Sequence, residues 1–178
     1  MKTLEDQMSF YAAYHQDARN KATHFLGVPM IIVSLFIPLS WLRFDVGPFH
    51  LSAAIVFAAI VMLYYVFLDA LLAVATSVIT ALFLTGAAWV AGQGTLAGWV
   101  AFALLFVGGW IIQLVGHAFE GRKPALADNL FQIFIAPIFL CAELFFALGY
   151  KPKLHAAVQE RARKMRMTWT DAKLTGAG

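Results

Sequence analysis

The sequence has few charged residues. Asp, Glu, Lys and Arg make up 13% of the 178 residues, about half the share usual in soluble domains. Apolar residues make up 61%, against a usual share of about 45–50%. A chain this small has too much surface to cover so much apolar area with so few polar side chains. These proportions exclude a disordered protein, a nucleic-acid-binding module and an ordinary cytosolic enzyme, and they predict an integral membrane protein.

The sequence also offers no cysteine pair, and we expect no cleavable signal peptide. The single cysteine, Cys141, lies in an apolar run, so neither a disulfide framework nor a thiolate metal site can be built from it. Acidic and amide residues precede the first apolar stretch, which is unlike a signal peptide. We therefore expect the first membrane span itself to direct insertion.

Long apolar runs predict four full spans, each close to the roughly 20 residues that a bilayer core requires. The expected spans are residues 25–42, 51–68, 70–91 and 96–115. The second and third spans form a hairpin, and Asp69 is the ionisable residue that lies between them. A fifth apolar stretch, 129–150, contains polar residues and Pro137, which indicate a broken or re-entrant segment. The expected fold is all-α, an integral membrane helical bundle.

The whole chain, 1–178, is expected to form a single membrane domain. It consists of an N-terminal surface helix (1–24), a transmembrane bundle (25–150) and a basic tail (151–178) that forms a helix on the lipid surface. With four full spans, 12 of the 13 Lys and Arg residues lie on one side, which the positive-inside rule makes cytoplasmic. Both termini are then cytoplasmic. The compact chain favours a bacterial inner membrane, with the endoplasmic reticulum as the alternative in a eukaryote.

Residues that can carry chemistry gather on that same side. His15 and His24 precede the first span and His117 follows the fourth, so three histidines from distant segments converge. His117 and Glu120 are three residues apart and share a helix face, as in carboxylate–histidine metal sites of helical bundles. His15 and His24 are half a turn out of phase on one straight helix. Both reach one site only if the chain breaks between them, near 18–21; otherwise only one of them is a ligand.

This donor set suits a metal ion. Two or three imidazoles with an oxygen ligand and open positions suit Fe(II), and zinc fits the same ligands. Bis-histidine haem would leave Glu120 and Arg122 unexplained. Arg122 either binds a lipid carboxylate or forms a surface ion pair with Glu120. Asp128 and Asn129 are typical of a helix cap, and Glu143 is either a carboxylate that orients a histidine or a buried acid paired with an arginine.

Two stretches resemble the motifs of a known family. They are YAAYHQDARNKATHFLGVP near the start and QLVGHAFEGRKPALADNLFQIFIAP after the fourth span. Both are similar to motifs of the fungal-type 2-hydroxy fatty acid dioxygenases, which shorten phytosphingosine-derived acids to odd-chain products. The resemblance covers about residues 8–152, although the spans between the motifs match only in being apolar.

The resemblance implies an Fe(II)-dependent oxygenase that needs no 2-oxoglutarate. It would convert a 2-hydroxy fatty acid and O2 to CO2 and an acid one carbon shorter, with the acyl tail lying between spans. The metal ligands implied are His15, His24 and His117. Of the polar motif residues, we assign Glu120 and Arg122 to catalysis, Arg122, Asn20 and Gln113 to substrate binding, and Asp128, Asn129 and Gln132 to the support of the ligands. Glu143, which lies outside the motifs, is assigned the same supporting role. His50 and His155 lie outside the motifs and are excluded.

Two other classes of function fit the same residues. A zinc-dependent membrane lipid hydrolase would use Glu120 as its general base. A non-enzymatic lipid-binding or transport protein would use the histidines for protons or headgroups, although only Glu143 is an ionisable residue midway along a span. Membrane lipids are expected partners and nucleic acid is not. Gly108, Gly109 and Gly116 fit helix packing within one chain or between the copies of a homo-oligomer.

Overall fold

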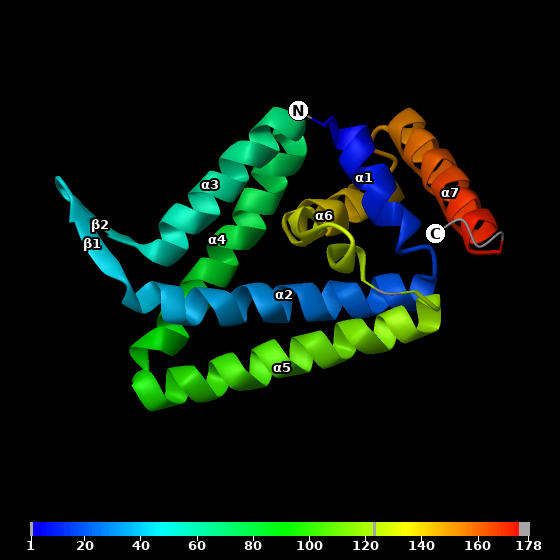
Figure 1. The fold of residues 1–178 in the computed structure, drawn as a ribbon. Coiled ribbons are helices and arrows are strands. Elements are labelled where there is room, and N and C mark those ends of the chain that lie inside the picture. The colour runs from blue at the N-terminus through cyan, green and yellow to red at the C-terminus, as the bar shows by residue number, and fades with distance from the viewer. Residues whose placement is uncertain (1, 123, 175–178) are drawn as a thin grey trace.

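The computed structural model describes residues 2–122 and 124–174, which form seven α-helices and one β-hairpin (Figure 1). In chain order the elements are α1 (Leu4–Ala13), α2 (Ala18–Trp41), β1 (Arg43–Val46), β2 (Phe49–Ser52), α3 (Ala53–Leu68), α4 (Ala70–Gly92), α5 (Thr95–Glu120), the 3-10 turns η1 (Ala125–Ala127) and η2 (Leu130–Phe134), α6 (Ala136–Ala147) and α7 (Pro152–Leu174). The expected mostly helical chain is confirmed.

Three of the helices, α2, α4 and α5, are long and apolar enough to cross a membrane, which supports association with a membrane. The hairpin of α3 and α4 turns at Asp69, as the sequence predicts. However, α3 has only 16 residues, fewer than the roughly 20 that span a bilayer core. The expected count of four full spans is therefore not confirmed.

Helices α2 and α5 lie side by side along most of their length (Figure 1). Small residues allow this contact, because a Cβ on Gly27 would lie 2.9 Å from the carbonyl oxygen of Gly109. A Cβ on Gly109 would lie 3.0 Å from the carbonyl oxygen of Gly27 in turn. Gly116 faces Thr23 and Asn20 of α2 in the same way. The glycines that the sequence marks as packing positions therefore serve a contact within this chain, and a homo-oligomer stays a prediction.

The turn between α3 and α4 is tied to the start of α7. The buried Asp69 side chain caps α4 by accepting hydrogen bonds from the N–H groups of Leu71 and Leu72, both at 3.1 Å. Its other oxygen lies 2.5 Å from Nζ of Lys151. One carboxylate thus fixes the helical hairpin against the C-terminal part of the chain.

Residues 43–52 form an antiparallel β-hairpin that the sequence does not predict. Arg43 pairs with Ser52 and Val46 with Phe49, and Gly47 adopts a φ of 58° in the turn. The hairpin projects from the end of α2 that lies away from α1 (Figure 1). His50 lies on it, 2.6 Å from Asp45, and is thus remote from the α1 end of the molecule.

The stretch 129–150 is broken at Ala136, as expected. Leu130–Phe134 form η2, and α6 begins at Ala136 with Pro137 in its first turn, where the missing N–H is not needed. The Tyr65 hydroxyl donates a hydrogen bond to the carbonyl oxygen of Phe134 at this break. A re-entrant path of this stretch through a bilayer stays a prediction.

The basic tail forms α7, which packs against α1 (Figure 1). Val158 and Ala162 are fully buried in the same apolar cluster as Met8 of α1. Arg161 of α7 forms an ion pair with Asp6 at 2.7 Å. The predicted basic helix is therefore present, but its apolar face is covered by protein. Contact between its other face and lipid stays a prediction.

Candidate metal and substrate site

Three histidines from three segments meet at one end of the α2–α5 pair. His15 lies in the turn between α1 and α2, His24 lies on α2, and His117 lies in the last turn of α5. All three side chains are buried, and one ring nitrogen from each lies within 4.8 Å of the others. This geometry agrees with the convergence expected from the sequence, while the role of the three rings as ligands stays a prediction.

A break between α1 and α2 brings His15 and His24 together. α1 ends at Ala13, and Asp17 caps α2 by accepting a hydrogen bond from the N–H of Arg19 at 2.8 Å. The break therefore lies at residues 14–17, slightly before the expected 18–21. The reason is that Asp17 is the residue whose side chain can close the first turn of α2.

Backbone carbonyls orient two of the three rings. His15 donates from Nδ1 to the carbonyl oxygen of Tyr11 at 2.7 Å, and His24 donates from Nδ1 to that of Asn20 at 2.8 Å. Since a carbonyl oxygen can only accept, each Nδ1 carries the proton and each Nε2 carries a lone pair. The two Nε2 atoms face each other at 3.2 Å. Two lone pairs at this distance repel unless a proton or a metal ion lies between them.

The third ring also has an unsatisfied nitrogen. Nδ1 of His117 is buried and has no hydrogen-bond partner among the described residues, which costs about 1–3 kcal/mol for a buried polar group. Its ring centroid lies 5.0 Å from those of both His15 and His24. A divalent metal held by three imidazoles would satisfy all three nitrogens and keep further positions open. The residues present therefore fit the metal that the sequence predicts.

The protonation state of His15 favours this use. Burial lowers the pKa of His15 well below its ordinary value, and the neighbouring His24 lowers it further. The ring is therefore neutral at pH 7, and a neutral imidazole is the form that binds a metal.

Glu120 holds the turn that carries His15. Its Oε2 accepts hydrogen bonds from the backbone N–H of Asp17 at 2.7 Å and from Nδ2 of Asn20 at 3.1 Å. Its Oε1 forms an ion pair with Arg166 of α7. Both oxygens of this buried carboxylate thus accept hydrogen bonds from the protein.

Asn20 links Glu120 to His24. Its Nδ2 also donates to the carbonyl oxygen of Tyr14 at 3.2 Å, and its own carbonyl oxygen accepts the hydrogen bond from His24. The side chain is fully buried. Asn20 therefore connects the ring of one histidine to the turn that carries another.

Arg122 and Asp128, both expected at the site, lie near aromatic residues. The Arg122 guanidinium packs over the Trp169 ring of α7 at 5.4 Å from its centroid. The Tyr14 hydroxyl donates to Asp128 at 2.5 Å, and the rings of Tyr14 and Trp169 lie 4.9 Å apart. Asn129 has the capping role expected of this pair of residues, since its side chain accepts from the N–H of Phe131 at 3.0 Å.

Glu143 and Gln132 are separated by the helix break. Glu143 accepts a hydrogen bond from Nζ of Lys21 at 2.8 Å, so its basic partner is a lysine where an arginine was expected. Gln132 is buried on η2, and its Nε2 donates to Oε1 of Gln7 at 3.3 Å. The interruption at Ala136 places Gln132 on η2 and Glu143 on α6.

The sequence does not indicate Arg166 and Trp169 as neighbours of the site. Both lie on α7, 29 and 32 residues beyond the end of the second motif, in a segment whose basic composition equally fits a lipid surface. No local pattern marks which residues of α7 face Glu120 or Arg122. The amphipathic periodicity of the tail indicates only that one of its faces packs against an apolar surface.

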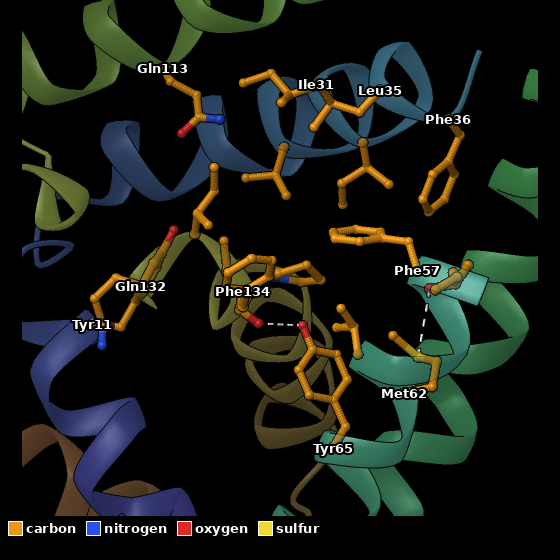
Figure 2. A pocket seen from close by; sticks show the side chains of 18 of the residues that line it. Tyr11, Ile31, Leu35, Phe36, Phe57, Met62, Tyr65, Gln113, Gln132 and Phe134 are labelled. Atoms are coloured by element: carbon orange, nitrogen blue, oxygen red, sulfur yellow. Dashed lines mark hydrogen bonds between the residues drawn. The ribbon is translucent and has the colours of Figure 1, made fainter. Parts of the chain in front are cut away.

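An apolar cavity of about 240 Å³ begins beside the histidines and runs between α2, α3 and η2. His15, Gln113 and Gln132 line one end, and Oε1 of Gln132 is buried without a hydrogen-bond partner among the described residues. Figure 2 shows Gln113 and Gln132 at one side of this space and Phe36, Phe57 and Met62 at the other. The cavity is therefore polar at the histidine end and apolar along its length.

Comparison with known proteins confirms the family that the two sequence motifs resemble. A family model described as "2-hydroxy-palmitic acid dioxygenase Mpo1-like" matches residues 1–148. The chain is 32% identical over 170 residues to the 2-hydroxy-palmitic acid dioxygenase MPO1 of Saccharomyces cerevisiae, and the alignment covers 92% of this chain and 94% of that protein. No solved structure gives a significant match. The chain belongs to the Mpo1-like family of 2-hydroxy-palmitic acid dioxygenases.

Proposed function

We propose that this protein is an Fe(II)-dependent dioxygenase that performs α-oxidation of 2-hydroxy fatty acids without 2-oxoglutarate. The observation that carries the proposal is the buried three-histidine cluster at the polar end of an apolar cavity. The reaction breaks the C1–C2 bond and adds O2: R–CH(OH)–COOH + O2 gives R–COOH + CO2 + H2O. These atoms balance without a reductant or a second substrate.

His15, His24 and His117 would hold the iron. Bound there, Fe(II) would supply the redox chemistry that uses O2 beside the carboxyl end of the substrate. The carbonyls of Tyr11 and Asn20 keep two of the rings in the tautomer that presents Nε2. The protein's contribution is thus a preset arrangement of neutral imidazoles in a buried site.

Gln113 and Gln132 are our proposed contacts for the polar end of the substrate. Both line the cavity beside His15, and the unpaired Oε1 of Gln132 can accept a hydrogen bond from the 2-hydroxyl group. The side-chain N–H groups of Gln113 can donate hydrogen bonds to the carboxylate. Arg122 does not line the cavity, so we propose that it acts through its contact with Trp169 of α7, not directly on the substrate.

Glu120 is, in this proposal, a positioning residue. Both of its oxygens accept hydrogen bonds from the protein, and a general base for hydrolysis needs a free lone pair directed at water. This bonding favours the oxygenase over the zinc-dependent hydrolase, in which Glu120 would act as the base.

For the membrane arrangement we propose four spans and a re-entrant α6, with both termini and the histidines on the cytoplasmic side. Three long apolar helices support this, as does the gathering of 12 of 13 Lys and Arg residues on one side. A single cysteine placed in the hairpin 43–52 should react with a membrane-impermeant maleimide from outside sealed cells.

The test uses the purified full chain in detergent. Metal content is measured first, and O2 uptake, CO2 release and acid products are then measured with 2-hydroxypalmitate after anaerobic loading with Fe(II). We expect one O2 consumed and one CO2 released per molecule of pentadecanoate formed. An active zinc-loaded protein that releases acids from lipid esters without O2 uptake would refute the proposal.

Matched histidine variants sharpen this test. His24→Ala and His117→Ala should abolish iron binding and O2 uptake, because each removes one of three ligands. His50→Ala and His155→Ala are the controls, since these side chains lie on the exposed hairpin and against Phe146 of α6. Retained iron and activity in His117→Ala would show that the cluster is not the metal site.

A further inference from the structure

We propose that the apolar cavity is the binding site for the acyl chain, and that Phe36 closes its far end and sets the longest chain accepted. This inference rests on the proposed function and deepens it, because it assigns the part of the site that selects the substrate by length. The polar head of the substrate would lie at the histidines, and its methyl end would lie against Phe36.

One stripe of α2 connects the two ends. Val28, Ile31, Ile32, Leu35 and Phe36 line the cavity, and their spacing is that of a single helix face. His24 lies one turn before Val28 on the same face. The same side of one helix therefore presents a proposed metal ligand, then a continuous apolar wall, then an aromatic ring.

The distance along this stripe fits a long acyl chain. Twelve residues separate His24 from Phe36, which is about 18 Å along the helix axis. An extended chain advances about 3.6 Å for every three bonds, so 18 Å corresponds to roughly 15 bonds. An acid of about 16 carbons would therefore reach from the histidines to Phe36.

The cavity stops at Phe36 because a packed core lies behind it. Phe36 is 3% exposed and belongs to a second apolar cluster with Ile37, Ala54, Ala58 and Ala87. Ala58 contributes to both the cavity wall and this cluster. A longer chain would have to displace close-packed side chains, which a core resists.

The polarity of the wall fixes the direction of the substrate. Polar side chains lie at the histidine end. Of the other lining residues, Tyr65 and Thr80 carry hydroxyl groups, which are directed at the carbonyl oxygen of Phe134 and at the sulfur of Met62, respectively. A carboxylate placed against Phe36 and Phe57 would have no partner there, which is costly for a buried charge. An acid therefore enters with its carboxyl group toward His15.

Two variants with opposite effects test the length limit. Phe36→Ala lengthens the cavity, and Ala58→Leu fills part of it. The measured quantity is kcat/KM of the Fe(II)-loaded protein on 2-hydroxy acids of increasing length, from about 10 to 22 carbons. Each methylene that the cavity buries should raise kcat/KM roughly fourfold. The kcat/KM of the wild type should therefore rise with chain length up to the limit and decline beyond it.

We expect Phe36→Ala to raise the kcat/KM ratio of the 20-carbon to the 16-carbon acid roughly tenfold or more. Ala58→Leu should lower the ratio of the 16-carbon to the 12-carbon acid by a similar factor. Phe146→Ala is the matched control, because Phe146 is a buried phenylalanine that does not line the cavity. If Phe36→Ala and Ala58→Leu keep the length profile of Phe146→Ala, the inference is overturned.

A binding measurement separates this inference from the proposed function. Metal-free protein is titrated with a fluorescent fatty acid, which is then displaced by non-hydroxylated acids of the same length series. A length limit that shifts in Phe36→Ala supports the acyl site even if no 2-hydroxy acid is oxidised, in which case only the proposed function fails. Binding without any dependence on length, in the wild type and both variants, refutes the acyl site.

Discussion

Gly116 is the position at which one methyl group should damage the histidine site most. A Cβ there would overlap Oγ1 of Thr23 and would lie 2.7 Å from Oδ1 of Asn20. Oγ1 of Thr23 donates a hydrogen bond to the carbonyl oxygen of Asn20 at 2.7 Å, the same oxygen that orients His24. Gly116→Ala must therefore either break this hydrogen bond or push α5, with His117, away from α2.

The expected cost follows from these two routes. Overpacking a close contact costs about 1–3 kcal/mol, and a lost hydrogen bond about 1 kcal/mol. For a chain of this size each kcal/mol lowers Tm by about 2–4 °C, so Gly116→Ala should lower Tm by roughly 2–12 °C. Iron affinity should fall about 10- to 100-fold, as when other supports of metal ligands are disturbed.

Gly108→Ala is the matched control on the same helix. Its Cβ would meet only the terminal methyl of Met30, at 3.2 Å, and a methionine end moves easily. We expect a change in Tm of less than about 2 °C and unchanged iron affinity. Thermal unfolding with and without Fe(II), together with an anaerobic iron titration, measures both variants. Equal behaviour of Gly116→Ala and Gly108→Ala would refute the reasoning that α2–α5 contact sets the spacing of the histidines.

Three further predictions concern residues around the site. Arg166→Gln and Glu120→Gln should each lower the free energy of unfolding, and the double variant should show a coupling of about 0.5–3 kcal/mol; additive effects would mean that the ion pair does not hold α7. Burial raises the pKa of Asp69, but Lys151 and the backbone N–H groups of Leu71 and Leu72 together outweigh burial and leave the pKa below its ordinary value of 3.8. The stability that these contacts provide should therefore be complete above pH 3.8 and decline as the pH falls through the lower native pKa. Lys151→Met should therefore lower Tm at pH 7 and flatten the loss in acid, whereas an unchanged acid profile would contradict this account. Gln132→Leu should raise KM for 2-hydroxy acids without weakening the binding of non-hydroxylated acids, and equal weakening of both would exclude a contact with the 2-hydroxyl group.

Neighbouring exposed residues provide controls for the two charge substitutions. Arg163 and Lys153 lie on α7 and are exposed; in sequence they are close to Arg166 and Lys151, respectively. Arg163→Gln and Lys153→Met change the net charge by the same amount and should leave stability within about 0.5 kcal/mol of the wild type.

The features that the sequence predicts correctly have local signals. The turn at Asp69 follows from an apolar run too long for one helix, and the break at Ala136 follows from a proline in the next position. The meeting of His15, His24 and His117 follows from counting crossings, because each pair of apolar segments returns the chain to one side. The helix break between His15 and His24 follows from their phase, although its position depends on which residue caps α2.

The features that the sequence does not reveal depend on long-range packing. The cavity is a space left between side chains of α2, α3 and η2, and an apolar sequence looks the same whether its residues meet or leave a gap. The ion pair between Glu120 and Arg166 joins residues that no local pattern relates. The hairpin at 43–52 is short, exposed and marked only by Gly47-Pro48, so pairing of its strands decides its structure.

The network around Glu120 joins segments that are synthesised far apart in time, so the proposed metal site is completed late in translation. His15 and His24 leave the ribosome early, but His117 follows 93 residues after His24 and Arg166 later still. At about 5–20 residues per second, the nascent chain exists for roughly 5–20 s with two of its three imidazoles. Until α7 arrives, the Glu120 carboxylate also lacks the arginine that neutralises it. On the proposed function, nascent chains that lack His117 and α7 would hold Fe(II) less tightly than the finished chain, which would limit redox-active iron next to membrane lipids.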